Sequence, residues 1–217
     1  RPVSPTGKEI QIVEEVALDT PFCNLLHFRK ASGGRGQPKV LIVAPLSGHF
    51  ATLLRPTVQK LLTDHDVYVT DWKNARDVPR NAGRFDLDDD IALIMDFMRH
   101  LGPGANLFAV CQPSPAAVAA TALMAEDGDS CTPASLTLMA GPIDTRVNTS
   151  TINDFAADHS LGWFERNLIV TAPIGSAGHG RRVYPGASQI SAFMMMNLER
   201  HFSSQLDWLD DLRDDGK

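Results

Sequence analysis

The sequence predicts an α/β fold in which a mostly parallel sheet carries helices on both faces. Four short apolar runs do not alternate between apolar and polar residues, as expected of strands buried on both faces; they are residues 40–44, 67–70, 106–110 and 135–139. Helical patterns separate them, and this strand–helix rhythm is typical of a doubly wound parallel sheet. An antiparallel hairpin is expected before them, with one strand between Ile10 and Leu18 and the other from Cys23 to Phe28.

Three helices are expected between the buried strands. The first has Leu54, Val58, Leu61 and Leu62 on one face, with Pro56 suited to its first turn. The second has an apolar stripe over residues 91–101, opens with three aspartates that suit the positive end of its dipole, and stops at a Gly-Pro pair. The third is expected from about residue 113 to 124 and is rich in alanine, which allows close packing on a sheet.

The regular rhythm ends after Asp144. The stretch that follows is loop-rich and partly helical, and it contains most of the tryptophan and several methionine residues of the chain. We therefore expect a core over residues 1–145 and a cap or lid over residues 146–217. The chain starts without methionine and ends in a polar run, so we also expect that it is truncated and that the rest of the core follows Lys217.

Composition excludes several classes of protein. A net charge of −6 provides no basic face, so nucleic acid is not an expected partner. No apolar run approaches the roughly 20 residues of a membrane-spanning helix, and the start does not resemble a signal peptide. The 3 cysteines are widely spaced, which indicates free thiols in a reducing cytoplasm. No metal-ligand spacing or dinucleotide glycine pattern occurs, so no metal and no cofactor are expected.

The segment around Cys111 contains the candidate catalytic nucleophile. A buried strand ends directly in a helix, and the residue at the corner is a possible nucleophile. The usual nucleophile elbow reads G-x-S-x-G because its corner is strained and the neighbours must be small. Here the pattern is A-x-C-x-P, in which Ala109 is small and Pro113 suits the first turn of a helix. The start of a helix also favours the negative charge of an attacking thiolate.

An oxyanion hole is expected beside this corner. The backbone N–H of Gln112, directly after Cys111, is one donor, and the second is expected from Ser47, Gly48 and His49 in the loop after the first buried strand. The alternative for Cys111 is a buried core thiol, since cysteine is among the most buried residue types. Spacing alone favours that alternative, and the strand–corner–helix context with the Ser-Gly-His loop makes the two interpretations about equal.

Four segments together resemble the intracellular polyhydroxyalkanoate depolymerases. They are Pro45-Leu46-Ser47-Gly48-His49-Phe50-Ala51-Thr52-Leu53-Leu54-Arg55, Gly83-Arg84-Phe85-Asp86-Leu87-Asp88-Asp89, Val110-Cys111-Gln112-Pro113 and Gly141-Pro142-Ile143-Asp144-Thr145-Arg146, and the similarity extends through Arg181-Arg182-Val183-Tyr184-Pro185-Gly186. The resemblance implies an α/β-hydrolase-type fold with a cysteine nucleophile, which is Cys111 here. It also implies hydrolysis of stored poly(3-hydroxybutyrate), with a cytoplasmic location on storage granules.

Part of the catalytic machinery implied by the resemblance has no counterpart in this chain. The catalytic aspartate and histidine of the family follow the cap, so we expect them beyond Lys217. Two other functions stay open. A polyester synthase also uses a cysteine, but in a G-x-C-x-G box that Ala109 and Pro113 do not match. A granule-surface binding protein with a dead site is the other alternative. The sequence does not predict the oligomeric state.

Other polar and aromatic residues are expected to be structural. His49 would contribute its backbone to the oxyanion loop, and the remaining histidines show no metal-ligand spacing. Asp144 follows a buried strand, and we expect it to pair with Arg146 instead of serving as the catalytic acid. Trp163 and Phe164 belong either to the core of the cap or to an apolar surface that contacts polyester.

Overall fold

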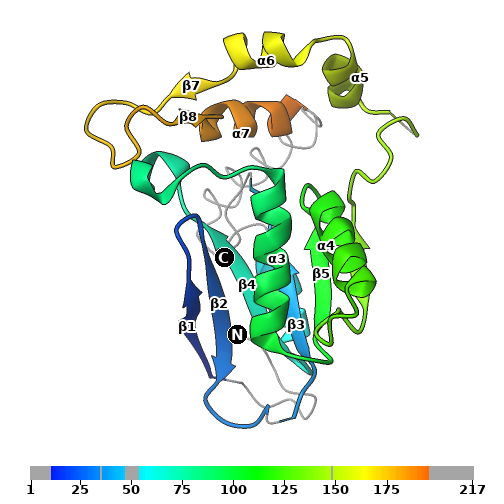
Figure 1. The fold of residues 1–217 in the computed structure, drawn as a ribbon. Helices are drawn as coiled ribbons and strands as arrows, with labels where there is room; N and C mark the ends of the chain where they lie inside the picture. Colours follow the sequence, from blue (N-terminus) through cyan, green and yellow to red (C-terminus); the bar gives the residue numbers. More distant parts are fainter. Residues whose placement is uncertain (1–10, 35, 47–53, 148, 196–217) are drawn as a thin grey trace, which may run out of the picture. The chain divides into compact units, whose positions relative to one another are not determined.

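A computed structural model describes residues 11–34, 36–46, 54–147 and 149–195. Its main sheet has six strands in the order β1-β2-β4-β3-β5-β6 (Figure 1). These strands are β1 (Ile12–Asp19), β2 (Cys23–Lys30), β3 (Lys39–Val43), β4 (Asp66–Trp72), β5 (Asn106–Val110) and β6 (Leu136–Met139). Each of the four apolar runs predicted from the sequence is a strand of this sheet. The expectation that all four are buried on both faces is wrong for β6, whose residues Thr137, Leu138 and Met139 are exposed at the edge of the described sheet.

The sheet is parallel over its second half and antiparallel over its first. β3 pairs in parallel with both β4 and β5, and β5 pairs in parallel with β6. β2 is antiparallel to β1 and to β4, so the expected entry hairpin is present and adds two strands to one edge. The carboxyl ends of β3, β4, β5 and β6 therefore meet at one edge of the sheet, where doubly wound folds place their sites.

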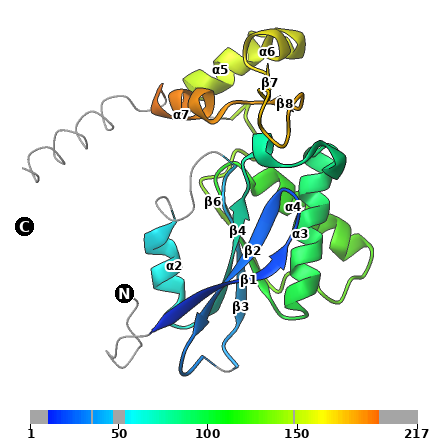
Figure 2. The ribbon, with the colours of Figure 1, turned by 90° about the vertical axis from the view of Figure 1, so that its left-hand side faces the viewer.

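Helices cover both faces of the sheet (Figure 2). On one face α2 (Arg55–Leu61) contributes Val58 to an apolar cluster with β3 and β4. On the other face α3 (Leu87–Leu101) and α4 (Ser114–Glu126) pack against the sheet and each other, with Phe97, Met98 and Met124 fully buried. The alanines of α4 allow this approach, since Ala116, Ala117 and Ala120 are all buried. The predicted mostly parallel sheet with helices on both faces is thus confirmed.

The ends of α3 follow the polar signals in the sequence. Asp86 caps the helix by accepting hydrogen bonds from the N–H groups of Asp88 and Asp89, and the Asp89 carboxylate accepts one from the Asp86 N–H in return. Gly102 ends the helix with a φ of 85°, a conformation that glycine adopts without a steric cost. Because α3 runs opposite to the parallel strands, its first turn lies toward their carboxyl ends.

The chain divides into two compact units. Unit 1 comprises residues 1–143 and 172–181, and unit 2 comprises residues 144–171 and 182–217. Within the described part of unit 2 are α5 (Thr151–Ala157), α6 (Leu161–Asn167), α7 (Gly186–Met195) and a two-stranded antiparallel pair of β7 (Val170–Thr171) with β8 (Arg182–Val183). Two short 3-10 helices, η1 (Ala75–Asp77) and η2 (Arg80–Ala82), follow β4 in unit 1. No helix among the described residues is long and apolar enough to cross a bilayer.

Within unit 1, Arg181 holds residues 172–181 against the segment that follows β4. Its guanidinium donates hydrogen bonds to the carbonyl oxygens of Val78 at 3.2 Å and Pro79 at 2.8 Å, and also to that of Gly83. The same group lies 5.0 Å from the centre of the Phe22 ring, a cation–π geometry. These contacts bring the loop between β7 and β8 onto the segment that follows β4.

Candidate active site

Cys111 lies at the corner between β5 and α4. β5 ends at Val110, and α4 begins at Ser114 after a short turn. The φ angle of Cys111 is +64°, and only one other described residue that is not glycine has a positive φ. A side chain with a Cβ adopts this left-handed conformation only when the surrounding structure imposes it. The corner is therefore strained in the way that an exposed nucleophile on a strand-to-helix turn requires.

Two backbone hydrogen bonds hold this corner. The Cys111 N–H donates to the carbonyl oxygen of Met139 at 2.7 Å, and the Ser114 N–H donates to the carbonyl oxygen of Cys111 at 3.1 Å. The first bond continues the parallel pairing of β5 with β6 by one residue. The second closes the turn that starts α4. Both polar groups of the Cys111 backbone are therefore fixed while its conformation is strained.

The three cysteines lie in different environments. All are free, and Cys23 is fully buried, whereas Cys111 and Cys131 are partly buried. Burial raises the pKa of the Cys23 thiol far above its ordinary value, so this thiol stays protonated at neutral pH. Cys111 packs at the margin of the apolar cluster formed by β3, β4 and α2 and still has exposed surface. This position distinguishes Cys111 from a core cysteine such as Cys23.

Gln112 follows the corner in an exposed turn. Its backbone N–H has no acceptor among the described residues. A free N–H directly after the sulfur-bearing residue is the position from which a hydrolase stabilises a developing oxyanion. The other expected donors, in Ser47, Gly48 and His49, lie outside the described residues.

Two side chains of β4 fix the point at which the chain leaves β3. The Ala44 N–H donates to the Thr70 hydroxyl at 2.8 Å, and the Trp72 indole N–H donates to the Ala44 carbonyl oxygen at 2.8 Å. Thr70 is 1% exposed and Ala44 is also buried. These bonds satisfy the Ala44 peptide groups beyond the end of β3 and set the direction in which the chain enters the predicted oxyanion loop. Sequence reasoning missed this role, because nothing in the local pattern marks Thr70 or Trp72.

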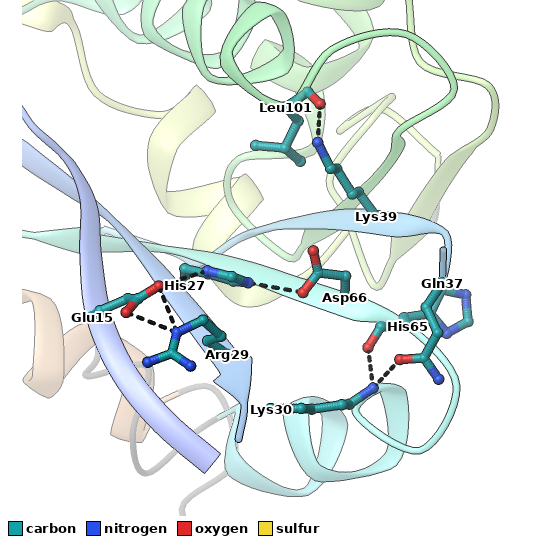
Figure 3. A network of polar contacts seen from close by, with 9 residues as sticks. All are labelled: Glu15, His27, Arg29, Lys30, Gln37, Lys39, His65, Asp66 and Leu101. Atoms are coloured by element: carbon teal, nitrogen blue, oxygen red, sulfur yellow. Dashed lines mark hydrogen bonds and ion pairs between the residues drawn. The ribbon is translucent and has the colours of Figure 1, made fainter. Parts of the chain in front are cut away.

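Three histidines lie at the amino ends of the parallel strands, opposite the edge that carries Cys111. His27 lies between two carboxylates, with Nδ1 at 3.1 Å from Glu15 Oε1 and Nε2 at 2.8 Å from Asp66 Oδ1 (Figure 3). Asp66 begins β4, and His65 precedes it. His100 is near the end of α3, where the Lys39 ammonium at the start of β3 donates to the Leu101 carbonyl oxygen at 2.6 Å. These imidazoles therefore do not serve as a base for Cys111.

The other polar residues considered in the sequence are Asp144 and four further histidines. The Asp144 carboxylate binds the Arg146 guanidinium through two hydrogen bonds of 2.8 and 2.9 Å, and this pairing lowers the pKa of Asp144. The expected structural role of Asp144 is thus present. His159 lies among the rings of Phe155, Trp163 and Phe164 in unit 2, and His179 is exposed in the loop before Arg181. His49 and His201 lie outside the described residues.

A metal centre has no support in the described ranges, where no group of three or more histidine, cysteine or acidic side chains is arranged to hold an ion. Asp90 lies in the first turn of α3, where burial raises its pKa to about 6. Its Oδ1 atom has no hydrogen-bond partner among the described residues. Asp90 is therefore a buried acid whose charge costs stability at neutral pH.

Residues 140–217 match the family model described as "PHB de-polymerase C-terminus". This segment is therefore similar to the C-terminal part of PHB depolymerases. The match starts one residue after β6 and includes all of unit 2, so the depolymerase resemblance predicted from the sequence is confirmed. Comparison with curated protein sequences found no match.

Several solved hydrolases are similar to the chain in structure. The thioesterase domain of a curacin biosynthetic pathway is 12% identical, with a TM-score of 0.44, over 68% of this chain and 50% of that one. A hyperthermophilic esterase from the archaeon Pyrobaculum calidifontis is 15% identical, with a TM-score of 0.42, over 66% and 47%. Brefeldin A esterase, a bacterial homologue of human hormone-sensitive lipase, is 18% identical, with a TM-score of 0.37, over 59% and 38%. The chain thus spans half or less of each of these proteins.

Proposed function

We propose that this PHB depolymerase segment belongs to an enzyme that hydrolyses the ester bonds of poly(3-hydroxybutyrate) through Cys111. The observation that carries the proposal is the +64° φ of Cys111 at a strand-to-helix corner, in a chain whose residues 140–217 match a PHB depolymerase model. A strained corner of this kind exposes a nucleophile at the carboxyl edge of the sheet. We propose the surface of a storage granule in the cytoplasm as the place of action.

The reaction proceeds in two steps, acylation of Cys111 and hydrolysis of the resulting thioester. The Cys111 thiolate attacks the ester carbonyl carbon, the new C–S bond forms, and the C–O bond to the leaving hydroxyl end of the polymer breaks as that oxygen takes up a proton. Water then attacks the thioester, which forms a carboxylate and returns the sulfur as a thiol or thiolate. The Gln112 N–H, together with the loop containing Ser47 to His49, would stabilise the oxyanion formed in each step.

Three of the described histidines are not candidates for the base of Cys111. His27, His65 and His100 lie at the opposite edge of the sheet, and both ring nitrogens of His27 already face carboxylates. By its resemblance to intracellular depolymerases, the protein would use a histidine and an aspartate that follow the cap. Cys111 and Gln112 would then be the part of the machinery held by the described residues.

Polymer turnover by matched cysteine variants of the full-length protein tests the proposal. Cys111→Ala should reduce release of 3-hydroxybutyrate units by at least about 10³-fold, because it removes the nucleophile. Cys131→Ala is the matched control, since it removes a second partly buried, free thiol and should retain turnover. Turnover by Cys111→Ala close to that of the unmodified protein would contradict the proposal.

A further inference from the structure

We propose that Gly141 and Ser114 are positioning residues for Cys111 and that a side chain at position 141 would displace the nucleophile. The inference rests on the proposed function of Cys111. It adds that the residue at position 141, in the turn that follows β6, has to lack a side chain. The elbow pattern asks for small residues two positions before and after the corner. Gly141, which follows β6, lies outside that pattern, and it contacts the first residue of α4.

The contact between Gly141 and Ser114 leaves no room for a methyl group. A Cβ on Gly141 would lie 2.0 Å from Ser114 Oγ, 2.2 Å from Ser114 Cβ and 3.3 Å from the Cys111 carbonyl oxygen. The first two distances are far below any van der Waals contact, and the nearest of these atoms belong to a short side chain that is fully buried. An alanine at this position therefore has to move Ser114 itself, or the turn after β6.

Movement of Ser114 reaches Cys111 through the backbone. The Ser114 N–H holds the Cys111 carbonyl oxygen at 3.1 Å, and Ser114 also begins α4. The Ser114 hydroxyl has no hydrogen-bond partner among the described residues, so this side chain is held by packing against its surroundings. A displaced Ser114 would loosen the hydrogen bond that closes the corner.

The turn after β6 also holds the corner from its other side. Met139 accepts the hydrogen bond from the Cys111 N–H, and Ala140, between Met139 and Gly141, has a φ of +54°. Ala140 is the second described residue that is not glycine and has a positive φ. The turns that contain these two strained residues are thus joined by the hydrogen bond from Cys111 to Met139 and by the close contact between Ser114 and Gly141. This arrangement explains why residue 141 has no side chain.

A double-mutant cycle in the full-length protein tests the contact. The variants are G141A, S114G and G141A/S114G, because glycine at 114 removes the two atoms that lie closest to the new Cβ. G186A is the matched control, since a Cβ on Gly186 meets nothing within 4 Å. Two readouts are measured for each variant: kcat and KM for polymer or soluble oligomer, and the alkylation rate of Cys111 by iodoacetamide relative to Cys131 in the same molecule.

G141A should lower kcat by about 10–100-fold with KM changed less than about threefold, because the nucleophile is misplaced while substrate binding is not. The ratio of the alkylation rates of Cys111 and Cys131 in G141A should differ by more than about threefold from that of the unmodified protein. In G141A/S114G, both kcat and this ratio should return most of the way to the values of the unmodified protein. A G141A protein with the kcat and alkylation ratio of G186A would overturn the inference. The inference would also be overturned if G141A/S114G had the same kcat and alkylation ratio as G141A. If G141A does not fold, the inference is overturned when G141A/S114G does not fold either.

Failure of the inference is distinguishable from failure of the proposed function. If Cys111→Ala retains turnover, the proposed function is wrong, and the alkylation ratios still report whether position 141 controls the corner. If Cys111→Ala abolishes turnover but G141A changes neither kcat nor the alkylation ratio, Cys111 remains the proposed nucleophile and the positioning role of Gly141 and Ser114 is wrong.

Discussion

The Cys111 N–H donates a 2.7 Å hydrogen bond to the carbonyl oxygen of Met139, the last residue of β6. This bond extends the parallel pairing of β5 and β6 past the end of β5, up to the residue that turns into α4. Because the Cys111 carbonyl oxygen also accepts a bond from Ser114, the strained peptide has no freedom to relax. The left-handed conformation costs about 1–2 kcal/mol, and the two bonds keep it populated.

Glycine at the corner should therefore be more stable than alanine. Cys111→Gly and Cys111→Ala both remove the thiol, but only alanine keeps the Cβ that opposes a φ of +64°. We expect the free energy of unfolding of Cys111→Gly to exceed that of Cys111→Ala by about 1 kcal/mol, measured by denaturant titration. The opposite order would mean that the corner is not strained.

Ala140→Gly should stabilise the protein for the same reason. Ala140 is exposed with a φ of +54°, so glycine removes strain and little packing. The expected gain in unfolding free energy is about 0.5–1 kcal/mol. The matched control is Ala122→Gly, at an exposed position inside α4, which should lose about 1 kcal/mol. Equal destabilisation by the two substitutions would contradict the assigned geometry of Ala140.

Thr70→Val should destabilise the protein without changing the volume of the side chain much. Valine cannot accept the hydrogen bond from the Ala44 N–H, which is buried and would lose its partner. The expected cost is about 1–3 kcal/mol of unfolding free energy. Thr137→Val, at an exposed position of β6, serves as the control and should be within about 0.5 kcal/mol of the unmodified protein. A Thr70→Val protein as stable as that control would show that Ala44 does not depend on Thr70.

Asp90 should make stability fall as pH rises from about 4 to about 6. Its pKa in the folded protein is about 6, above the ordinary value of 3.8, so the folded state binds the proton more tightly and loses stability as this proton leaves. Asp90→Asn should be more stable than the unmodified protein by about 1–2 kcal/mol at pH 7, and this difference should disappear below about pH 4.

Asp88→Asn is the control for the Asp90 prediction, since it removes an exposed carboxylate from the same turn of α3. It loses a favourable interaction with the helix end and should cost a few tenths of a kcal/mol. Thermal unfolding of both variants between pH 4 and 7 measures the comparison. A constant difference between Asp90→Asn and the unmodified protein across this range would contradict the assigned burial of the charge.

Local sequence patterns predicted the parts of the fold and site that depend on neighbours along the chain. Short motifs predicted the strands, the aspartates that open α3, the glycine that ends it and the strand–corner–helix around Cys111, although not the exposure of β6. Each reflects a preference of a few consecutive residues for one backbone conformation. The position of Cys111 could be predicted for this reason.

The contacts that support the site join residues far apart in the sequence and had no local signal. Thr70 and Trp72 hold Ala44 across separations of 26 and 28 residues, and His27 meets Asp66 across 39. The requirement for glycine at 141 comes from Ser114 on another element. Such pairings follow from the register of the sheet, which the sequence of a single strand does not specify.

Trapping the acyl-enzyme tests the central claim most directly. The full-length protein is mixed with a soluble 3-hydroxybutyrate oligomer, quenched in acid within the first turnover, digested and analysed by mass spectrometry. We predict that a 3-hydroxybutyryl group is attached to the peptide containing Cys111, that hydroxylamine removes it, and that Cys131 carries none. An acyl group on a serine, or turnover with no acylation of Cys111 at any time, would contradict the account.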